Sequence, residues 1–117
     1  MTQPLPSYLR AHRRKWALTQ GELAGLLGER SRSAVSKYET LERTPNREAI
    51  LALEIVFQEA AHALLPALSH DVRRTVLRNA VALQEKLASK SDARSLRKRQ
   101  LLDALITRLT QHHEESP

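Results

Sequence analysis

The stretch Leu18–Glu39, LTQGELAGLLGERSRSAVSKYE, decides the fold of this chain because it carries the pattern of two short helices joined by a glycine turn. Thr19 and Glu22 stand three residues apart, which is the spacing of a capping box. Gly28 follows at the point where a left-handed residue ends a helix at least cost. We therefore predict a first helix over residues 19–27 that is capped by Thr19 and stopped by Gly28.

The second helix of the pair is predicted over residues 31–39, with Ser31 as its cap. Val35 and Tyr38 lie three apart, so they share one side of this helix and face inward. The polar residues of the same helix are left on the outer side: Arg32, Ser33, Ser36 and Lys37. A helix with such a face is suited to contact phosphates and base edges.

Helical periodicity continues on both sides of this pair. We expect a preceding helix over 7–16, a following helix that Asn46 caps, and a short turn over 60–65 that ends at Pro66. Strand patterns are nearly absent. The bulk that we expect the helix after Asn46 to bury in the core comes from Ile50, Leu53, Ile55, Val56 and Phe57.

The segment from Leu9 to about Leu53, a little under half of the chain, resembles the Xre/Cro-type helix-turn-helix domain of phage repressors and many bacterial regulators. The turn departs from the commonest pattern of that family, because Glu29 and Arg30 add one residue, so we expect a longer and more exposed turn. The residues that carry the resemblance are Leu9, Arg13, Leu18-Thr19-Gln20, Glu22-Leu23-Ala24, Leu27-Gly28, Val35-Ser36-Lys37-Tyr38-Glu39, Arg43 and Pro45.

The resemblance implies roles for individual residues in binding double-stranded DNA. Base contacts are expected from Arg32, Ser33, Ser36 and Lys37, of which Arg32 is the strongest candidate because a guanidinium can bind guanine with two hydrogen bonds. Phosphate contacts are expected from Gln20, Arg30 and Arg43, and Gln20 has the alternative of steadying the recognition helix. Arg13 and Glu39 are expected to form a structural salt bridge.

Composition agrees with an anionic partner, since the 117-residue chain has a formal charge of +6 and a pI near 10.3. The chain lacks cysteine, an apolar stretch long enough for export or a membrane span, and any recognisable catalytic or metal-binding motif. We therefore expect a cytoplasmic, non-enzymatic protein that uses no cofactor and no metal and does not bind a membrane. His112 and His113 in the polar tail are expected to be solvated rather than to bind metal.

Beyond Pro66 two apolar stripes recur every three or four residues, which predicts two amphipathic helices separated by a break at Ser89 to Asp92. Ser91 or Asp92 is the expected cap of the second. The first stripe is Leu68, Val72, Val76, Ala80, Leu83 and Leu87. The second is Leu96, Leu101, Leu105 and Leu109, flanked by Leu102 and Ile106.

These stripes must be buried either within the chain or against another chain. We favour dimerisation through Leu68, Val72, Val76, Leu83, Leu87, Leu101, Leu105 and Leu109, because one such domain reads only half of a two-fold site. The alternative is an antiparallel hairpin that folds onto the DNA-binding domain. The basic segment Arg94 to Arg99 is suited either to grip flanking DNA or to be a solvated face.

The sequence thus predicts an all-α protein: a five-helix, repressor-like helix-turn-helix domain in residues 1–66, and two amphipathic helices in residues 67–117 with a disordered tail. The expected function is that of a sequence-specific transcriptional regulator, a repressor that acts as a homodimer. One alternative is an antitoxin that also binds a toxin and regulates its own promoter. Another is an architectural protein that binds DNA without regard to sequence.

Overall fold

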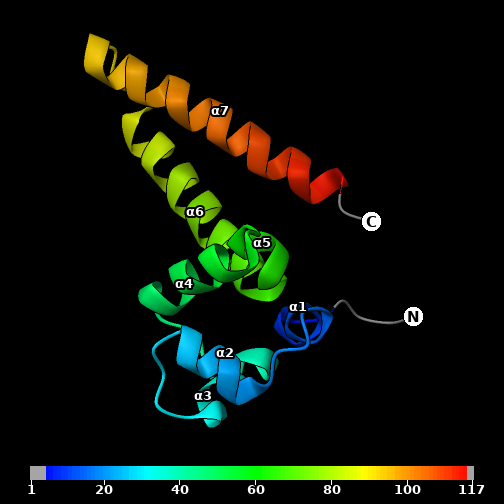
Figure 1. Ribbon diagram of the computed structural model, residues 1–117. Coiled ribbons are helices and arrows are strands. Elements are labelled where there is room, and N and C mark those ends of the chain that lie inside the picture. The colour runs from blue at the N-terminus through cyan, green and yellow to red at the C-terminus, as the bar shows by residue number, and fades with distance from the viewer. Residues whose placement is uncertain (1–4, 116–117) are drawn as a thin grey trace. The chain divides into compact units, whose positions relative to one another are not determined.

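A computed structural model describes the backbone of residues 5–115 and the side chains of residues 5–111, and this part of the chain contains helices and no strand (Figure 1). The predicted all-α class is confirmed. The chain divides into two compact units between His70 and Asp71, whereas the predicted boundary was at Pro66. The helices are α1 (Leu9–Lys15), α2 (Gln20–Leu26), α3 (Arg32–Thr40), α4 (Arg47–Phe57), α5 (Ala61–Leu64), α6 (Pro66–Leu87) and α7 (Ala93–Glu115).

The first helix of the predicted pair, α2, begins and ends as its sequence predicts. The Glu22 amide donates to Thr19 Oγ1 at 3.0 Å, and the Thr19 amide donates to Glu22 Oε1 at 2.9 Å, which completes the capping box. Gly28 has a φ of 75°, and the Glu29 amide donates back to the Ala24 carbonyl at 2.9 Å. This return bond is the closing bond of a Schellman motif, so the turn is held by backbone hydrogen bonds.

The caps of the other helices follow the sequence less uniformly. Asn46 Oδ1 accepts from the Ala49 amide at 2.8 Å and caps α4 as predicted. Ser31 precedes α3 in an extended conformation, but its side chain makes no capping bond and its hydroxyl instead lies 2.8 Å from Ser33 Oγ. Ser31 therefore occupies the N-cap position of α3 as predicted, but its side chain does not make the capping hydrogen bond typical of serine there.

The first unit buries one apolar cluster to which each of α1 to α5 contributes. Leu9, Leu23, Val35 and Leu53 have no measurable exposure. Ile55 was predicted to join this core, but it is 76% exposed because it stands two residues from Leu53 and so points to the far side of α4. The buried members are Leu9, Leu23, Ala24, Ala34, Val35, Tyr38, Ala49, Leu53, Phe57, Leu64 and Leu65.

Three helices of the first unit are followed by a residue other than glycine in the left-handed region. Ala17 has a φ of 57° after α1, Leu41 a φ of 58° after α3, and Gln58 a φ of 51° after α4. An L side chain adopts this conformation at a cost of about 1–2 kcal/mol. Leu41 is partly buried and packs against the core, so its side chain offsets part of that cost.

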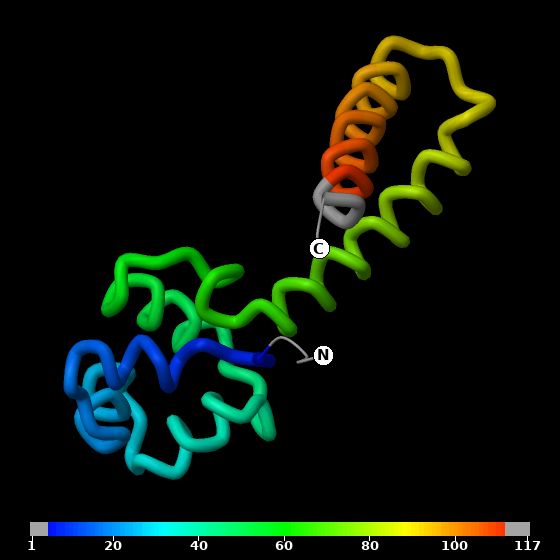
Figure 2. The backbone as a smooth tube through the Cα atoms, turned by 90° about the vertical axis from the view of Figure 1, so that its right-hand side faces the viewer, coloured from blue at the N-terminus to red at the C-terminus, as the bar shows by residue number. Residues whose placement is uncertain are grey.

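The second unit is a helical hairpin, in which α7 runs antiparallel to the part of α6 that follows His70 (Figure 2). Asp92 caps α7, since its carboxylate accepts from the Ser95 amide at 3.2 Å and from the Ser95 hydroxyl at 2.7 Å. The hairpin core contains Ala80, Leu87 and Leu102. An antiparallel hairpin within the chain was the alternative to dimerisation, and Ala80, Leu87 and Leu102 are buried in such a hairpin.

The predicted disordered tail is partly helical, because α7 continues to Glu115. The last two residues of the chain, 116 and 117, lie outside the described part. Within residues 5–115, the helices all fall short of the combined length and apolarity that crossing a bilayer requires.

Candidate nucleic-acid interface

Helix α3 has one buried side and one polar side. Ala34, Val35 and Tyr38 are buried, and their spacing sets which way the helix faces. The predicted base-contact residues Arg32, Ser33, Ser36 and Lys37 are all exposed. Thr40 is exposed as well and follows Ser36 by four residues, so it extends the same surface. We name the exposed side chains of α3, from Arg32 to Thr40, the α3 face.

Sequence reasoning did not single out Thr40, although the 33, 36, 37, 40 spacing already contains it. Its hydroxyl lies 3.3 Å from the Lys37 carbonyl and 3.4 Å from the Ser36 carbonyl, and it donates toward them. Thr40 therefore extends the α3 face by one exposed residue whose hydroxyl is directed toward its own helix.

A nearly buried ion pair joins the end of α3 to α1. Arg13 Nε lies 2.6 Å from Glu39 Oε2, with side-chain exposures of 11% and 5%, which is the salt bridge that the sequence predicts. Arg13 Nη1 also donates to the Leu18 carbonyl at 2.9 Å. Gln20 Nε2 donates to Glu39 Oε1 at 3.1 Å, so α2 joins the same carboxylate. Glu39 thus ties α1, α2 and α3 together and fixes the direction of α3.

The longer turn between α2 and α3 is fastened to the body of the unit. Glu29 Oε1 accepts from the Tyr38 hydroxyl at 2.6 Å, and the Arg43 guanidinium lies 5.7 Å from the centroid of the Tyr38 ring. Burial, and then the neighbouring Glu29 carboxylate, raise the pKa of Tyr38 above its ordinary value of 10.0, while Arg43 acts in the opposite direction. The expected exposure of the turn therefore applies to Arg30 but not to Glu29, which is partly buried.

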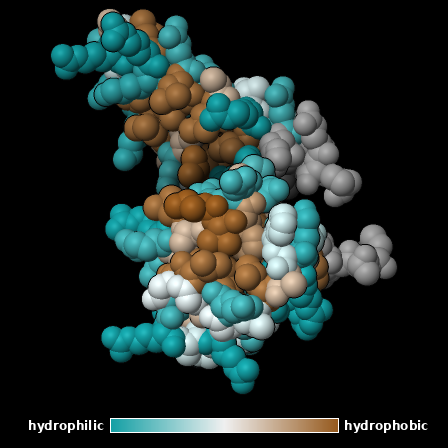
Figure 3. All heavy atoms as spheres, in the orientation of Figure 1, coloured by the Kyte–Doolittle hydropathy of each residue, from teal (hydrophilic) through white to brown (hydrophobic). Residues whose placement is uncertain are grey.

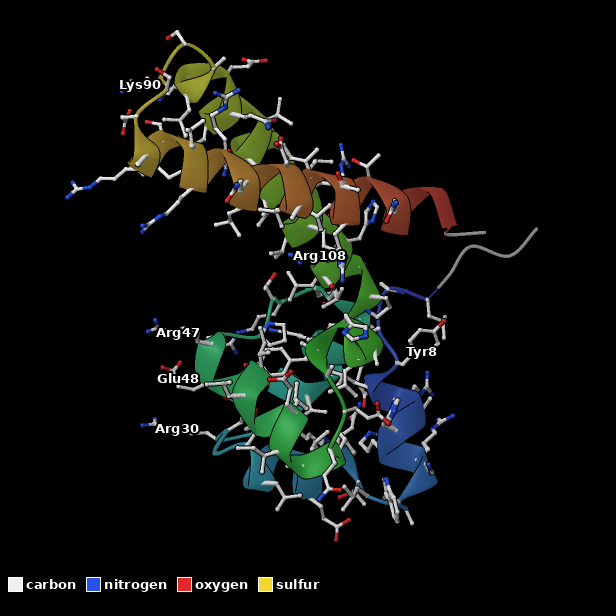
Figure 4. The ribbon with its side chains drawn as sticks, turned by 90° about the horizontal axis from the view of Figure 1, so that it is seen from above. Tyr8, Arg30, Arg47, Glu48, Lys90 and Arg108 are labelled. Carbon is white, nitrogen blue, oxygen red and sulfur yellow. The ribbon has the colours of Figure 1, made fainter. Side chains whose placement is uncertain are left out.

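The predicted phosphate-contact residues lie in different environments. Arg30 extends from the turn into solvent (Figure 4), and Arg43 is exposed beside Tyr38. Gln20 is partly buried and already donates one hydrogen to Glu39. Its amide nitrogen carries a second hydrogen, so the bond to Glu39 leaves one donor for another ligand.

The residues predicted for dimerisation are divided between different environments. Leu68 packs against the core of the first unit, and Leu87 is buried within the hairpin. Leu105 and Leu109 are partly buried, and Leu105 packs against the hairpin core. The exposed members are Val72, Val76, Leu83 and Leu101. Sequence periodicity marked all eight as apolar positions, but it did not separate those that the chain itself covers.

Among known proteins, no family model, curated protein or solved structure matches this chain.

Proposed function

We propose that the protein is a sequence-specific DNA-binding transcriptional regulator that reads duplex DNA with the α3 face. The observation that supports the proposal is that α3 is held in place on its buried side and is polar on its exposed side. The Glu39 network holds the buried side, and Arg32, Ser33, Ser36 and Lys37 lie on the exposed side. An α-helix fits the major groove of duplex DNA, where those side-chain types pair with base edges.

The roles proposed for single residues follow from their reach. Arg32 opens α3 and can bond guanine O6 and N7 together, for about 1–3 kcal/mol of discrimination between bases. Arg30 and Arg43 are exposed cations beside α3 and suit phosphate contacts that position the domain. Gln20 steadies α3 through Glu39 and offers its second amide hydrogen to a phosphate.

The resemblance to Xre/Cro-type domains suggests how such a reader acts. We propose a repressor that occupies a two-fold operator as a homodimer in the cytoplasm and excludes polymerase from the promoter. A single α3 reads one half-site, and two copies related by a two-fold axis place two helices about one helical turn apart. The exposed apolar residues of the hairpin, Val72, Val76, Leu83 and Leu101, are the proposed contacts between copies.

The proposal is tested by selecting bound DNA from a random pool and then comparing variants on the selected and on random duplexes. Arg32→Ala is expected to lower the preference for the selected site by about 1–3 kcal/mol, because a base contact is lost. Arg43→Ala is expected to weaken both duplexes alike and to reduce the slope of log affinity against log salt by about one. Arg74→Ala, which removes one exposed charge from α6, is the control.

The result that contradicts base reading is an equal loss on both duplexes in the Arg32→Ala variant. A selected pool without any shared sequence would instead indicate an architectural DNA binder. A selected site without two-fold symmetry would contradict the homodimer.

A second candidate function, that of an antitoxin-like protein which binds a protein partner and regulates its own promoter, is favoured by one observation. The hairpin leaves large apolar side chains uncovered, among them Leu101 at 66% exposure and Val72 at 54%. Exposed apolar groups that gather on one face mark protein interaction sites. Copurification of a protein encoded by an adjacent reading frame would support this function.

A further inference from the structure

Four exposed apolar residues of the hairpin lie on one side of α6 and α7, whereas Val81 at 39% and Leu96 at 46% exposure lie on the opposite flank. On α6, Val72, Val76 and Leu83 follow one another at spacings of four and seven residues, and their exposures are 54%, 39% and 44%. On α7, Leu101 is 66% exposed and precedes Leu105 by four residues. Figure 3 shows apolar side chains gathered over α6 and α7 on the side turned to the viewer.

The two sets lie on the same face of the hairpin. Ala80 on α6 and Leu102 on α7 are both buried in the hairpin core, so each gives a reference direction on its own helix. Successive residues are turned by about 100° around the axis of an α-helix. Around α6, Val76 and Leu83 therefore lie about 40–60° from Ala80. Around α7, Leu101 lies about 100° from Leu102, and the rotation from the core residue has the same sense on both helices. Since α6 and α7 are antiparallel, one sense of rotation leads to one side. We name this surface, made of Val72, Val76, Leu83 and Leu101, the apolar face.

The charges beside the apolar face are all positive. Four exposed cations lie on the same side of the hairpin as the apolar face, by the same helical spacing. They are Lys86 on α6 and Arg94, Lys98 and Arg108 on α7. Figure 4 shows Arg108 projecting from α7, and Lys90 at the turn between the helices adds a further cation. Among the side chains that the structure describes, no ion pair involves any of these cations.

The acidic residues of the described hairpin lie elsewhere. Asp103 follows Leu102 by one residue, which turns it to the opposite flank, and it accepts a hydrogen bond from Gln84. Counted around α6 from Ala80 in the same way, Asp71 and Glu85 lie on the side of the helix that is remote from both the core and the apolar face. Asp92 caps α7 through Ser95. The apolar face therefore carries a border of one sign only.

This one-sign border discriminates between possible occupants. A second copy of the chain meets the face through a two-fold contact, which places the same patch on both sides; the opposed cations make this contact between copies weaker than a contact with an acidic partner. A membrane surface is favoured by aromatic side chains at the interface, and residues 71–117 contain no Phe, Trp or Tyr. A DNA backbone pairs with the cations but leaves the apolar side chains in water. An amphipathic helix with acidic flanks can bury the apolar side chains of the face and can also pair with the cations beside it.

We infer that the apolar face binds an acidic amphipathic helix of another protein, which packs against α6 and α7 as a third helix. Within residues 71–111, the buried apolar core of the hairpin consists of Ala80, Leu87 and Leu102, so a third helix would add apolar burial that the pair lacks. The same side chains are those proposed above for contact between copies. Resting on that proposed function, the acidic helix displaces the second copy and thereby weakens operator binding.

The binding is tested on the full chain without DNA, by fluorescence anisotropy of a labelled synthetic helix of about 20 residues, long enough to span the face. The probe has leucines on one side and glutamates on the flanks, and the control probe has lysines in place of the glutamates. Only the acidic probe is expected to bind. Its affinity should fall as salt rises from about 50 to 200 mM, because the cations at the border are exposed.

Matched variants locate the site. Leu101→Ser is expected to weaken the acidic probe about tenfold or more, whereas Leu96→Ser, a 46% exposed leucine that lies on the other flank of α7, should not. The double variant Arg94→Glu, Lys98→Glu is expected to weaken it about tenfold or more, whereas Arg74→Glu, Arg78→Glu on the far side of α6 should not. All six substituted positions are exposed and lie outside the hairpin core, and circular dichroism checks that the helix content is kept.

Several results would overturn the inference. Equal binding of the acidic and basic probes would show a nonspecific apolar surface. A hairpin dimer that excludes the acidic probe at low salt would assign the face to a second copy. Tighter binding to anionic vesicles than to the probe, with the same dependence on Leu101, would assign it to membranes. A protein that binds the acidic probe but shows no preferred DNA sequence would refute the proposed function and leave the site standing.

Discussion

The two units of this chain are both helical, but they are stabilised by different means. The first unit surrounds eleven buried apolar residues with short helices and locks α3 with the Arg13–Glu39 pair and the Glu29–Tyr38 bond. The second unit has two helices of 22 and 23 residues, the first of which begins before the unit boundary. Among its described side chains, those of residues 71–111, three apolar residues are buried. Helix length is therefore a poor guide to stability here. The short helices are fixed by tertiary contacts, and the long ones leave part of their apolar surface exposed.

The largest expected effect is on stability and tests the hydrogen-bonded ion pair of Glu39 with Arg13 in the first unit. Glu39→Ala removes the acceptor shared by Arg13 and Gln20 and leaves the 11% exposed Arg13 side chain without its counter-charge. We expect the free energy of unfolding to fall by about 3–5 kcal/mol, as for other buried pairs that lose one partner. Urea unfolding followed by tryptophan fluorescence and circular dichroism measures this change.

The chain offers a matched control for this experiment in Arg47 and Glu48. Their 4.0 Å contact joins side chains that are 90% and 76% exposed. Glu48→Ala is therefore expected to cost below about 1 kcal/mol. Similar losses in the two variants would show that Glu39 adds no more than a surface charge does, and that the first unit does not depend on the ion pair of Glu39 with Arg13.

The next effect tests the thin core of the hairpin. Leu102→Ala removes one of three buried apolar residues, at a cost of about 2–3 kcal/mol. The amides of the hairpin helices should then exchange hydrogen much faster, while those of α2 and α3 keep their protection, because the two units have separate cores. Native-state hydrogen exchange followed by mass spectrometry measures both regions in one experiment.

Leu101→Ala is the control for Leu102→Ala, because Leu101 is the next residue and is 66% exposed. Its effect on exchange in a monomeric sample should be small. Equal loss of protection in α2 and α3 after Leu102→Ala would mean that the units unfold as one, and the comparison between them would fail.

The smallest expected effect concerns the bond between Tyr38 and Glu29. Tyr38→Phe removes the hydroxyl and leaves the Glu29 carboxylate without this donor, for a loss of about 1–2 kcal/mol near neutral pH. The raised pKa of Tyr38 means that the folded chain holds the phenol proton more tightly than the unfolded chain does. This stabilisation is complete below the ordinary pKa of 10.0 and disappears as the pH rises through the higher folded-state pKa.

The difference in stability between the parent chain and Tyr38→Phe should therefore narrow above pH 10.0, and chemical unfolding at a series of pH values measures it. Tyr8→Phe, at a residue that is 36% exposed, is the control and should leave the stability unchanged. A difference that stays constant into the alkaline range would contradict the coupling of Tyr38 to Glu29.

Local signals predicted the elements of this fold well, because they act within a few residues. Thr19 with Glu22, Gly28, and Asn46 each form the predicted local structure, and Asp92 is one of the two predicted caps of α7. Such caps are set by backbone groups three or four positions away, so the neighbouring sequence nearly determines them. All-helical architecture and the break before α7 follow from the same local patterns.

The burial and tertiary contacts of single side chains were predicted less well, because they depend on residues that are distant in the sequence. Ile55 is as apolar as its neighbours, but α4 turns it to solvent. Leu68 lies on the predicted stripe, yet it belongs to the core of the first unit. The bond between Glu29 and Tyr38 crosses nine residues and depends on the shape of the turn. At the α3 face, the exposed residues were predicted by period, and the Arg13–Glu39 pair came from the family resemblance.

The uneven distribution of aromatic residues gives each unit its own optical signature. Tyr8, Trp16, Tyr38 and Phe57 all precede His70, so near-ultraviolet absorption and intrinsic fluorescence report on the first unit alone. Peptide dichroism in the far ultraviolet reports on both units together. Unfolding of the hairpin alone thus changes the dichroism and leaves the fluorescence constant, so the two signals together distinguish the units without any added label.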